Sequence, residues 1–193
     1  MKKILLLSIC LIFPLRILAQ TGLKTGEIAP TFTALDNAGK SIDLKELLKT
    51  HKAVVLFFYR GQWCPYCNKQ IKQLQDSLQL LTEKGAYVVG VTPETSDNIK
   101  TTVDKTRASF SMIQDKGYQI MKAYDVNYTV NNETLSLLTK YGIDLEKNNG
   151  NKDHVLPVPA TYIINNLGKI SFVYFNKDYT KRATVSSLLK AIN

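Results

Sequence analysis

The sequence has no apolar stretch long enough for a stable membrane anchor. The stretch Ile4 to Phe13 is shorter than the roughly 20 residues that span a bilayer. Two lysines precede it and Ile17-Leu18-Ala19 follows it, which is typical of a cleaved signal peptide; a buried N-terminal strand or helix is the alternative. We expect residues 1–19 to be the signal and residues 20–193 the mature protein, periplasmic or secreted, with no stable membrane insertion after cleavage.

Cysteine is also scarce, since Cys10, Cys64 and Cys67 are the three in the chain. Cys10 lies in the expected signal, so the mature chain keeps one Cys-x-x-Cys pair. A bridge across so short a loop constrains almost nothing in the unfolded chain, which argues against a disulfide scaffold. An exported protein meets an oxidising compartment, so we expect the pair to carry out redox chemistry.

Dense basic runs, internal repeats and low-complexity segments are absent. The net charge is +9, but the lysines are scattered along the chain. This pattern favours a solvated, mildly basic surface over a nucleic-acid-binding patch, and we expect no nucleic-acid partner. A mature chain of this length suits a single domain.

Hydrophobic periodicity predicts strands that alternate with helices. Residues 31–44 read as a hairpin, residues 53–59 as a strand buried on both faces, and residues 67–84 as an amphipathic helix. The order of elements predicts an α/β sheet with helices on both sides. Residues 127–153 form a long polar insertion with one helical piece around residues 134–141, expected to be a lid or a partner-docking surface.

The cysteine pair lies where a strand and its loop give way to a helix. Pro65 suits the first helical turn, and free backbone N–H groups and the positive end of the helix dipole would face Cys64. Both favour a thiolate at Cys64, whereas Cys67, one turn inside, is expected to be more buried and neutral. We therefore expect Cys64 to attack and Cys67 to resolve the product into an intramolecular redox-active disulfide.

Several separated segments resemble one family. The segments GEIAPTFTALDNAGK, FYRGQWCPYC, FSMIQDKGYQIMKAYDV and LPVPATYIINNLGKI are similar to the AhpC/TSA family, in its peroxiredoxin-like, Cys-x-x-Cys-containing branch of the thioredoxin superfamily. The resemblance covers the chain from about Gly26 onward. It implies a thioredoxin-like fold, a central mixed sheet flanked by helices, with an N-terminal β-hairpin extension and an insertion before a cis-proline loop. It also implies an oxidoreductase without a cofactor that is reduced by an external thiol donor such as thioredoxin.

The chain departs from the family at its peroxide-binding residues. Gly61 stands where typical peroxiredoxins have Thr or Ser, Phe57 where they have Pro, and Pro159 where they have Arg. The usual hydrogen-bond set is therefore incomplete. Arg60, four residues before Cys64, is the candidate replacement cation, and a solvated loop arginine is the alternative.

Other residues near the pair in the expected fold have two interpretations each. Pro159 resembles a cis-proline facing the dithiol, where it would pair with a substrate strand, and the alternative is a trans proline entering a strand. Trp63 and Tyr66 are expected to shield the dithiol and contact substrate, or else to pack in the core. Arg182, in the segment Asp178-Tyr179 to Arg182, is expected to cap the last helix without a chemical role.

These observations lead to a thiol redox enzyme as the first hypothesis, in which Cys64 attacks a hydroperoxide or a disulfide. Family resemblance favours hydroperoxides and the missing Thr and Arg favour disulfides, so we expect weak peroxidase and clear disulfide reductase activity. The alternative is a copper- or zinc-binding metallochaperone that uses Cys64, Cys67 and His154. A permanently oxidised, redox-inert pair is the third possibility.

Overall fold

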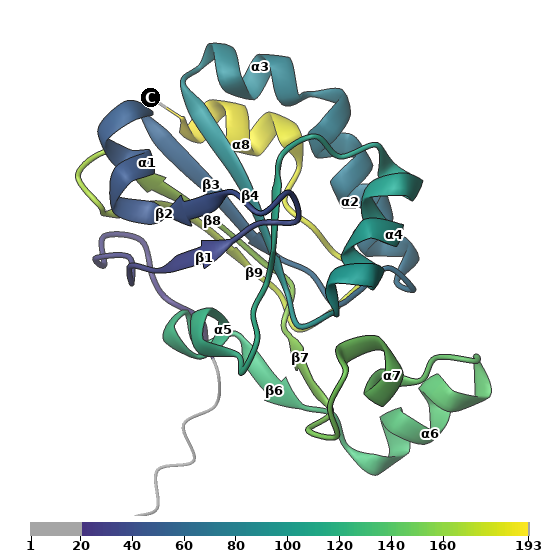
Figure 1. Cartoon of the computed structure of the whole chain (residues 1–193). Helices are drawn as coiled ribbons and strands as arrows, with labels where there is room; N and C mark the ends of the chain where they lie inside the picture. Colours follow the sequence, from purple (N-terminus) through teal and green to yellow (C-terminus); the bar gives the residue numbers. More distant parts are fainter. Residues whose placement is uncertain (1–20, 193) are drawn as a thin grey trace, which may run out of the picture.

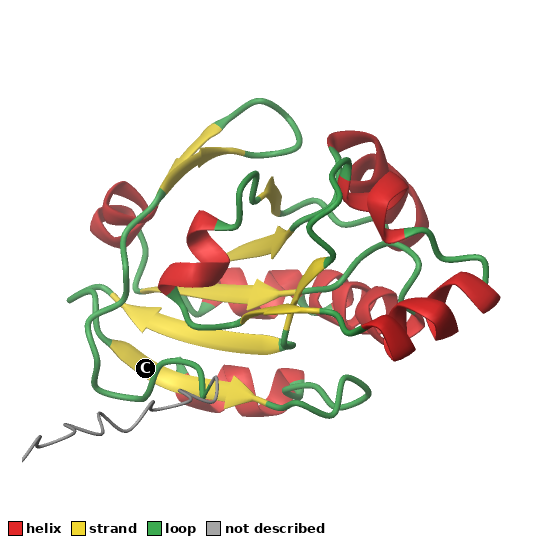
Figure 2. Cartoon of the chain, turned by 90° about the horizontal axis from the view of Figure 1, so that it is seen from below, coloured by secondary structure: helices red, strands yellow, loops and turns green. Residues whose placement is uncertain are grey.

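The central feature of the fold is a mixed sheet of five strands. The computed structural model describes residues 21–192, so the expected signal and Cys10 lie outside the described residues. The strand order is β5-β4-β3-β8-β9 (Figures 1 and 2). The strands span Ser111–Gln114 (β5), Ala86–Thr92 (β4), Ala53–Phe58 (β3), Ala160–Asn165 (β8) and Ile170–Phe175 (β9). β3, β4 and β5 are parallel, whereas β8 is antiparallel to both β3 and β9. The mixed sheet predicted from the resemblance is confirmed.

Helices cover both faces of this sheet because its central strand is apolar on both sides. All six residues of β3 are buried, and successive side chains point to opposite faces. Val55 and Phe57 pack in a core with residues of four helices, while Val54 and Leu56 pack in a second core with residues of two helices. The first group is α2 (Pro65–Asp76), α3 (Leu78–Glu83), α4 (Ser96–Thr106) and α8 (Val185–Ala191), and the second is α1 (Leu44–Thr50) and α5 (Gln119–Ala123).

The hairpin extension is confirmed. β1 (Thr33–Leu35) pairs antiparallel with β2 (Ser41–Asp43). Asp43 then caps α1 by accepting hydrogen bonds from the first backbone N–H groups of the helix.

The helix predicted over residues 67–84 is interrupted. α2 ends at Asp76 and α3 begins at Leu78, because Ser77 between them has φ −108° and ψ 10°, outside the helical range. The apolar periodicity continues across this break, so the pattern could not reveal it. No helix among residues 21–192 is both long and apolar enough to span a membrane.

The insertion is more ordered than its polar composition predicted. It contains β6 (Asn127–Thr129), α6 (Asn132–Lys140) and α7 (Leu145–Asn149), and β6 pairs antiparallel with β7 (Val155–Pro157). Val130, Leu138, Leu145 and Leu156 form a small apolar core of its own. Figure 1 shows this unit in green at the lower right, beside the end of the sheet. The helical piece predicted around residues 134–141 is confirmed as α6, whereas α7 was not predicted.

Candidate active site

The two cysteines lie at the turn from β3 into α2, as the sequence predicts. Cys64 is the N-cap of α2 with extended backbone, and Pro65 is the first helical residue. Both thiols are unbridged and buried, with 1% of Cys64 and none of Cys67 exposed. The structure therefore shows the reduced pair in an environment nearly closed to water.

The negative charge of this pair is stabilised at Cys67. Its sulfur accepts hydrogen bonds from the backbone N–H of Arg60 at 3.4 Å and from Nη2 of Arg182 at 3.3 Å. Burial raises the pKa of Cys67, but the hydrogen bond from Cys64 and the guanidinium of Arg182 outweigh it and lower that pKa to about 6. The hydrogen bond that Cys64 donates, together with burial, raises the pKa of Cys64.

This arrangement reverses the predicted protonation states of the two thiols before any reaction. The sequence predicted an ionised Cys64 and a neutral Cys67 from helix-terminus effects. The Cys64 side chain accepts no capping hydrogen bond, whereas Cys67 accepts hydrogen bonds from a backbone N–H and a cation. Direct charge-assisted hydrogen bonds of this kind outweigh a helix dipole, which is worth about 0.3–1 kcal/mol.

Arg182 is a candidate functional residue that the sequence analysis did not identify. It was expected to cap the last helix, but Thr184 caps α8 and Arg182 contacts Cys67, 115 positions away in the chain. Its Nε donates to Gln70 at 2.8 Å, and Gln70 in turn donates to Thr161 at 3.3 Å. These contacts hold the guanidinium against the sulfur. No local pattern in the sequence signals a contact across such a distance.

Arg60 is buried near the dithiol, as expected of a replacement cation and not of a solvated loop arginine. It is 3% exposed, and its guanidinium carbon lies 4.9 Å from the ring centroid of Trp63 and 4.5 Å from that of Tyr179. Such stacking stabilises a cation, yet its Nε has no hydrogen-bond partner and no ion pair among residues 21–192 involves Arg60. A buried cation without an anion is a place where developing negative charge would be stabilised.

The two aromatic candidates differ in exposure. Trp63 is half-buried. It packs against the core that contains Val55 and Phe57 and against the small core of the insertion. Tyr66 is 41% exposed, and its ring lies edge-on to Tyr179 at 5.9 Å. Arg60 contacts Trp63 and Tyr179, and Tyr179 contacts Tyr66, so the four side chains form one cluster.

Pro159 is not a cis-proline, so the predicted cis-proline loop is wrong. No peptide bond among the described residues is cis. Val158, between β7 and β8, continues the pairing of β7 by donating its N–H to Val126 at 2.7 Å. The trans proline is the alternative that the sequence left open. Pro159 still lines a cavity of about 320 Å³ together with Tyr128, Val158, Lys177 and Tyr179.

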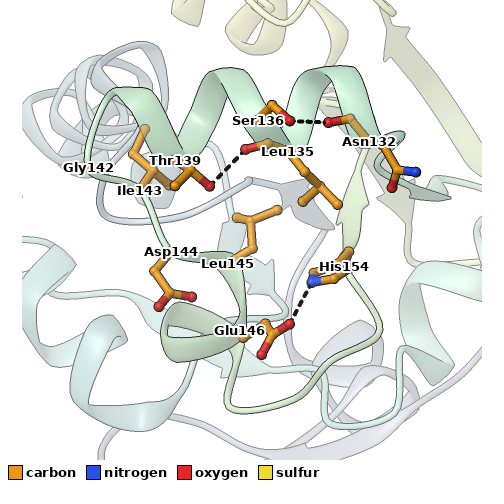
Figure 3. Close-up of a pocket in the computed structure, with 10 residues that line it drawn as sticks. All are labelled: Asn132, Leu135, Ser136, Thr139, Gly142, Ile143, Asp144, Leu145, Glu146 and His154. Carbon is orange, nitrogen blue, oxygen red and sulfur yellow. Dashed lines mark hydrogen bonds and ion pairs between the residues drawn. The ribbon is translucent and has the colours of Figure 1, made fainter.

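His154 does not join the cysteines, which contradicts the proposed metal site. Its Nε2 lies 3.1 Å from Oε1 of Glu146, and both line a separate cavity of about 800 Å³ inside the insertion (Figure 3). Within residues 21–192 no group of three or more His, Cys, Asp or Glu side chains is arranged to hold a metal ion. The copper- or zinc-binding alternative therefore loses its third ligand.

Glu94 is a second residue that the sequence did not single out. It is fully buried at the end of β4, and Oε1 accepts the backbone N–H of Gln62 at 2.5 Å. Thr102 donates to its other oxygen at 3.4 Å. The carboxyl group thereby fixes the loop that precedes Cys64.

The same carboxyl group explains why position 61 carries no side chain. A Cβ atom on Gly61 would lie 2.5 Å from Nε1 of Trp63 and 2.8 Å from Oε1 of Glu94, closer than van der Waals contact allows. The position cannot hold the Thr or Ser of typical peroxiredoxins with this backbone. The missing hydroxyl is thus a consequence of local packing.

Burial raises the pKa of Glu94 to about 7, above the 4.5 of an ordinary glutamate. The groups that face it act in both directions: the charge of Cys67 raises this pKa, whereas the N–H of Gln62, the hydroxyl of Thr102 and the charge of Lys105 lower it. Between pH 4.5 and 7 the folded protein consequently binds more protons than the unfolded chain. The contribution of Glu94 to stability is then largest below pH 4.5 and declines as the pH rises to 7.

We expect Glu94→Gln to remove this pH dependence. The free energy of unfolding of the variant, relative to wild type, should rise from pH 4.5 to 7 and then level off, with a slope of at most about 1.4 kcal/mol per pH unit. Urea unfolding of the reduced proteins at a series of pH values measures this difference. The exposed Glu83→Gln is the matched control and should run parallel to wild type. A Glu94→Gln curve parallel to wild type would contradict the prediction.

Comparisons with known proteins agree with the segments singled out in the sequence. The profile of the AhpC/TSA family matches residues 25–173. A chloroplastic peroxiredoxin Q from Triticum aestivum is 26% identical over 184 residues, covering 93% of this chain and 73% of that protein. A putative peroxiredoxin bcp from Buchnera aphidicola is 29% identical over 165 residues, covering 84% of this chain and 92% of that protein. The crystal structure of peroxidoxin BcpB from Mycobacterium tuberculosis superimposes with a TM-score of 0.69 at 19% identity, covering 88% of this chain and 96% of that one, and supports the fold.

Proposed function

The chain belongs to the AhpC/TSA family of thiol-dependent, peroxiredoxin-like oxidoreductases, and from this premise we propose that it reduces hydroperoxides and disulfides through Cys64. The observation that carries the proposal is the buried Cys67 sulfur, which lies 3.3 Å from Nη2 of Arg182 and interacts with the neighbouring thiol of Cys64. This pair holds one thiolate and one thiol side by side. A nucleophile and its base are therefore already in contact.

In the proposed reaction, Cys67 is the base that activates Cys64. The proton of Cys64 passes to the Cys67 thiolate as the Cys64 sulfur attacks the terminal oxygen of a hydroperoxide. The O–O bond breaks, Cys64 becomes a sulfenic acid, and the leaving alkoxide takes the proton from Cys67 to form an alcohol. The regenerated Cys67 thiolate then attacks the Cys64 sulfur and expels hydroxide, which becomes water on protonation.

The cycle closes with reduction by an external dithiol. The Cys64–Cys67 disulfide accepts two electrons from a thioredoxin-like donor, which is itself oxidised to a disulfide. With a disulfide as substrate, Cys64 attacks a sulfur instead of an oxygen and releases a thiolate. The same pair of residues thus serves both electrophiles.

The geometry favours disulfides over hydroperoxides. The leaving group of a hydroperoxide is a strongly basic alkoxide that needs a hydrogen-bond donor, and Gly61 supplies none. A thiolate leaves more readily because its conjugate acid has a lower pKa. Arg60 is the candidate cation for either reaction, since it contacts Trp63, which precedes Cys64, and has no ion pair among the described residues.

Stopped-flow mixing of the reduced protein with hydrogen peroxide, with an organic hydroperoxide and with a small disulfide tests the proposal. We expect oxidation faster than that of a free thiol with every substrate, and fastest with the disulfide. Peroxide rates no better than those of a free thiol would remove the peroxidase activity from the proposal. The same outcome with the disulfide would remove the enzymatic function altogether.

We also propose that the protein is exported to the periplasm or secreted. The support is the segment of residues 1–19 with its basic start and apolar centre. N-terminal sequencing of the protein from cell fractions tests this: an exported form that begins at Gln20 supports it, and an intact Met1 in the cytoplasmic fraction contradicts it.

A further inference from the structure

The site as described has a cation for the leaving oxygen but no hydroxyl donor. Gly61 cannot carry one, because its Cβ position is occupied by Trp63 and Glu94. Stabilisation of charge that develops during a reaction depends on preorganised donors near the reacting atoms. A hydrogen-bond donor for the leaving oxygen must therefore come from another element of the fold.

Two phenols, those of Tyr128 and Tyr179, border a cavity near Arg60. Tyr128 lines the cavity of about 320 Å³ together with Pro159 and Tyr179. Tyr179 also lies on the guanidinium of Arg60, at 4.5 Å from its ring centroid. Tyr179 therefore both lines this cavity and stacks on Arg60.

The charges of Arg60, Cys64 and Cys67 all act on the hydroxyl of Tyr128. Burial raises the pKa of Tyr128, the charge of Arg60 lowers it, and the charges of Cys64 and Cys67 raise it. The net effect is upward, so the hydroxyl stays protonated and can donate a hydrogen bond at neutral pH.

The backbone of the insertion holds this residue in place. Tyr128 is the middle residue of β6 and pairs with the fully buried Leu156 of β7. β7 leads directly into Pro159 and β8. The ring of Tyr128 also packs with the small core of the insertion, which Trp63 contacts from the active-site loop.

We propose that Tyr128 is a catalytic residue of the peroxidase reaction: its hydroxyl donates a hydrogen bond to the leaving oxygen of a hydroperoxide held between it and Arg60. The insertion, through β6, supplies the donor that position 61 cannot carry. This inference rests on the proposed function. Tyr66 and Tyr179, which are 41% and 47% exposed, are less shielded from water and so are weaker candidates for the same task.

Tyr128→Phe tests the inference because it removes the hydroxyl and keeps the ring. We expect kcat/KM for hydroperoxides to fall about ten- to a hundredfold, somewhat less than the loss of a complete oxyanion-hole donor. The rate with a small disulfide should stay within about twofold, because a thiolate leaving group has less need of a donor. Tyr141→Phe, in a 75% exposed tyrosine of the same insertion, is the matched control and should react like wild type with both substrates.

Titration of the ultraviolet thiolate absorbance separates chemistry from damage to the site. An unchanged pKa of Cys67 in Tyr128→Phe, together with a loss confined to hydroperoxides, supports the role. An unchanged hydroperoxide rate in Tyr128→Phe overturns the role. An equal loss of rate with both substrates, together with a shifted pKa of Cys67, also overturns it, because Tyr128 would then have a structural role. The hydroperoxide rate of the wild-type protein tests the proposed function separately. If that rate is no better than that of a free thiol, both the peroxidase activity and this inference are overturned.

Discussion

The Cys67→Ser variant is expected to consume one equivalent of hydroperoxide and then stop. Without the second sulfur, the sulfenic acid on Cys64 has no resolving thiol, so turnover with an external dithiol donor is lost. The first oxidation should also slow by about 10²- to 10⁴-fold, the usual range for removal of a general base. Mass spectrometry of the peroxide-treated variant should show one added oxygen on Cys64.

The Cys64→Ser variant is expected to react no faster than a free thiol, because the remaining sulfur of Cys67 is fully buried. The pair of variants also tests the assignment of roles. Rapid oxidation of Cys64→Ser with an inert Cys67→Ser would make Cys67 the nucleophile and contradict the mechanism. Continued turnover by Cys67→Ser would show that the intramolecular disulfide is not required.

Arg182→Ala is expected to raise the pKa of Cys67 from about 6 toward the ordinary thiol value of 9. The guanidinium lies 3.3 Å from the sulfur, and an opposite charge at such a distance is worth about 1–3 pKa units. The thiolate present at pH 7 should consequently fall about two- to hundredfold. Activity at neutral pH should fall with it and recover as the pH rises above the new pKa.

Ultraviolet titration of the reduced variant gives the pKa directly, and initial rates across the same pH range give the activity. Lys181→Ala removes a positive charge from the neighbouring exposed residue, whose backbone oxygen alone contacts Arg182. This control should titrate like wild type. If Arg182→Ala also titrates like wild type, the guanidinium does not stabilise the thiolate, and the charge of the pair must be held by other groups.

The local features of the site were predictable from the sequence. Cys64, Pro65 and Cys67 lie within one turn of each other, so their place at the start of a helix follows from the apolar strand before them and the helical periodicity after them. The hairpin and the central strand follow from equally short patterns. These elements form where expected because each depends on residues close together in the chain.

The conformation of Pro159 and the order within residues 127–153 were not predictable in the same way. The proline is trans, and the segment before it is held by the pairing of β7 with β6. The insertion folds because three apolar residues spread over its length meet Leu156 of β7 in one small core. Both outcomes depend on contacts between separate segments, and local composition does not determine such contacts.

The sequence by itself determined that this protein carries a dithiol at a strand-to-helix turn and belongs to a redox family. The tertiary structure alone decided which sulfur bears the charge, because Arg182, 115 positions from Cys67, lies against that sulfur. It likewise brought the carboxyl of Glu94 under the loop before Cys64 and Tyr128 to the cavity beside Pro159. Coulomb and hydrogen-bond energies depend on distance in space, and folding sets those distances between residues that the chain keeps far apart.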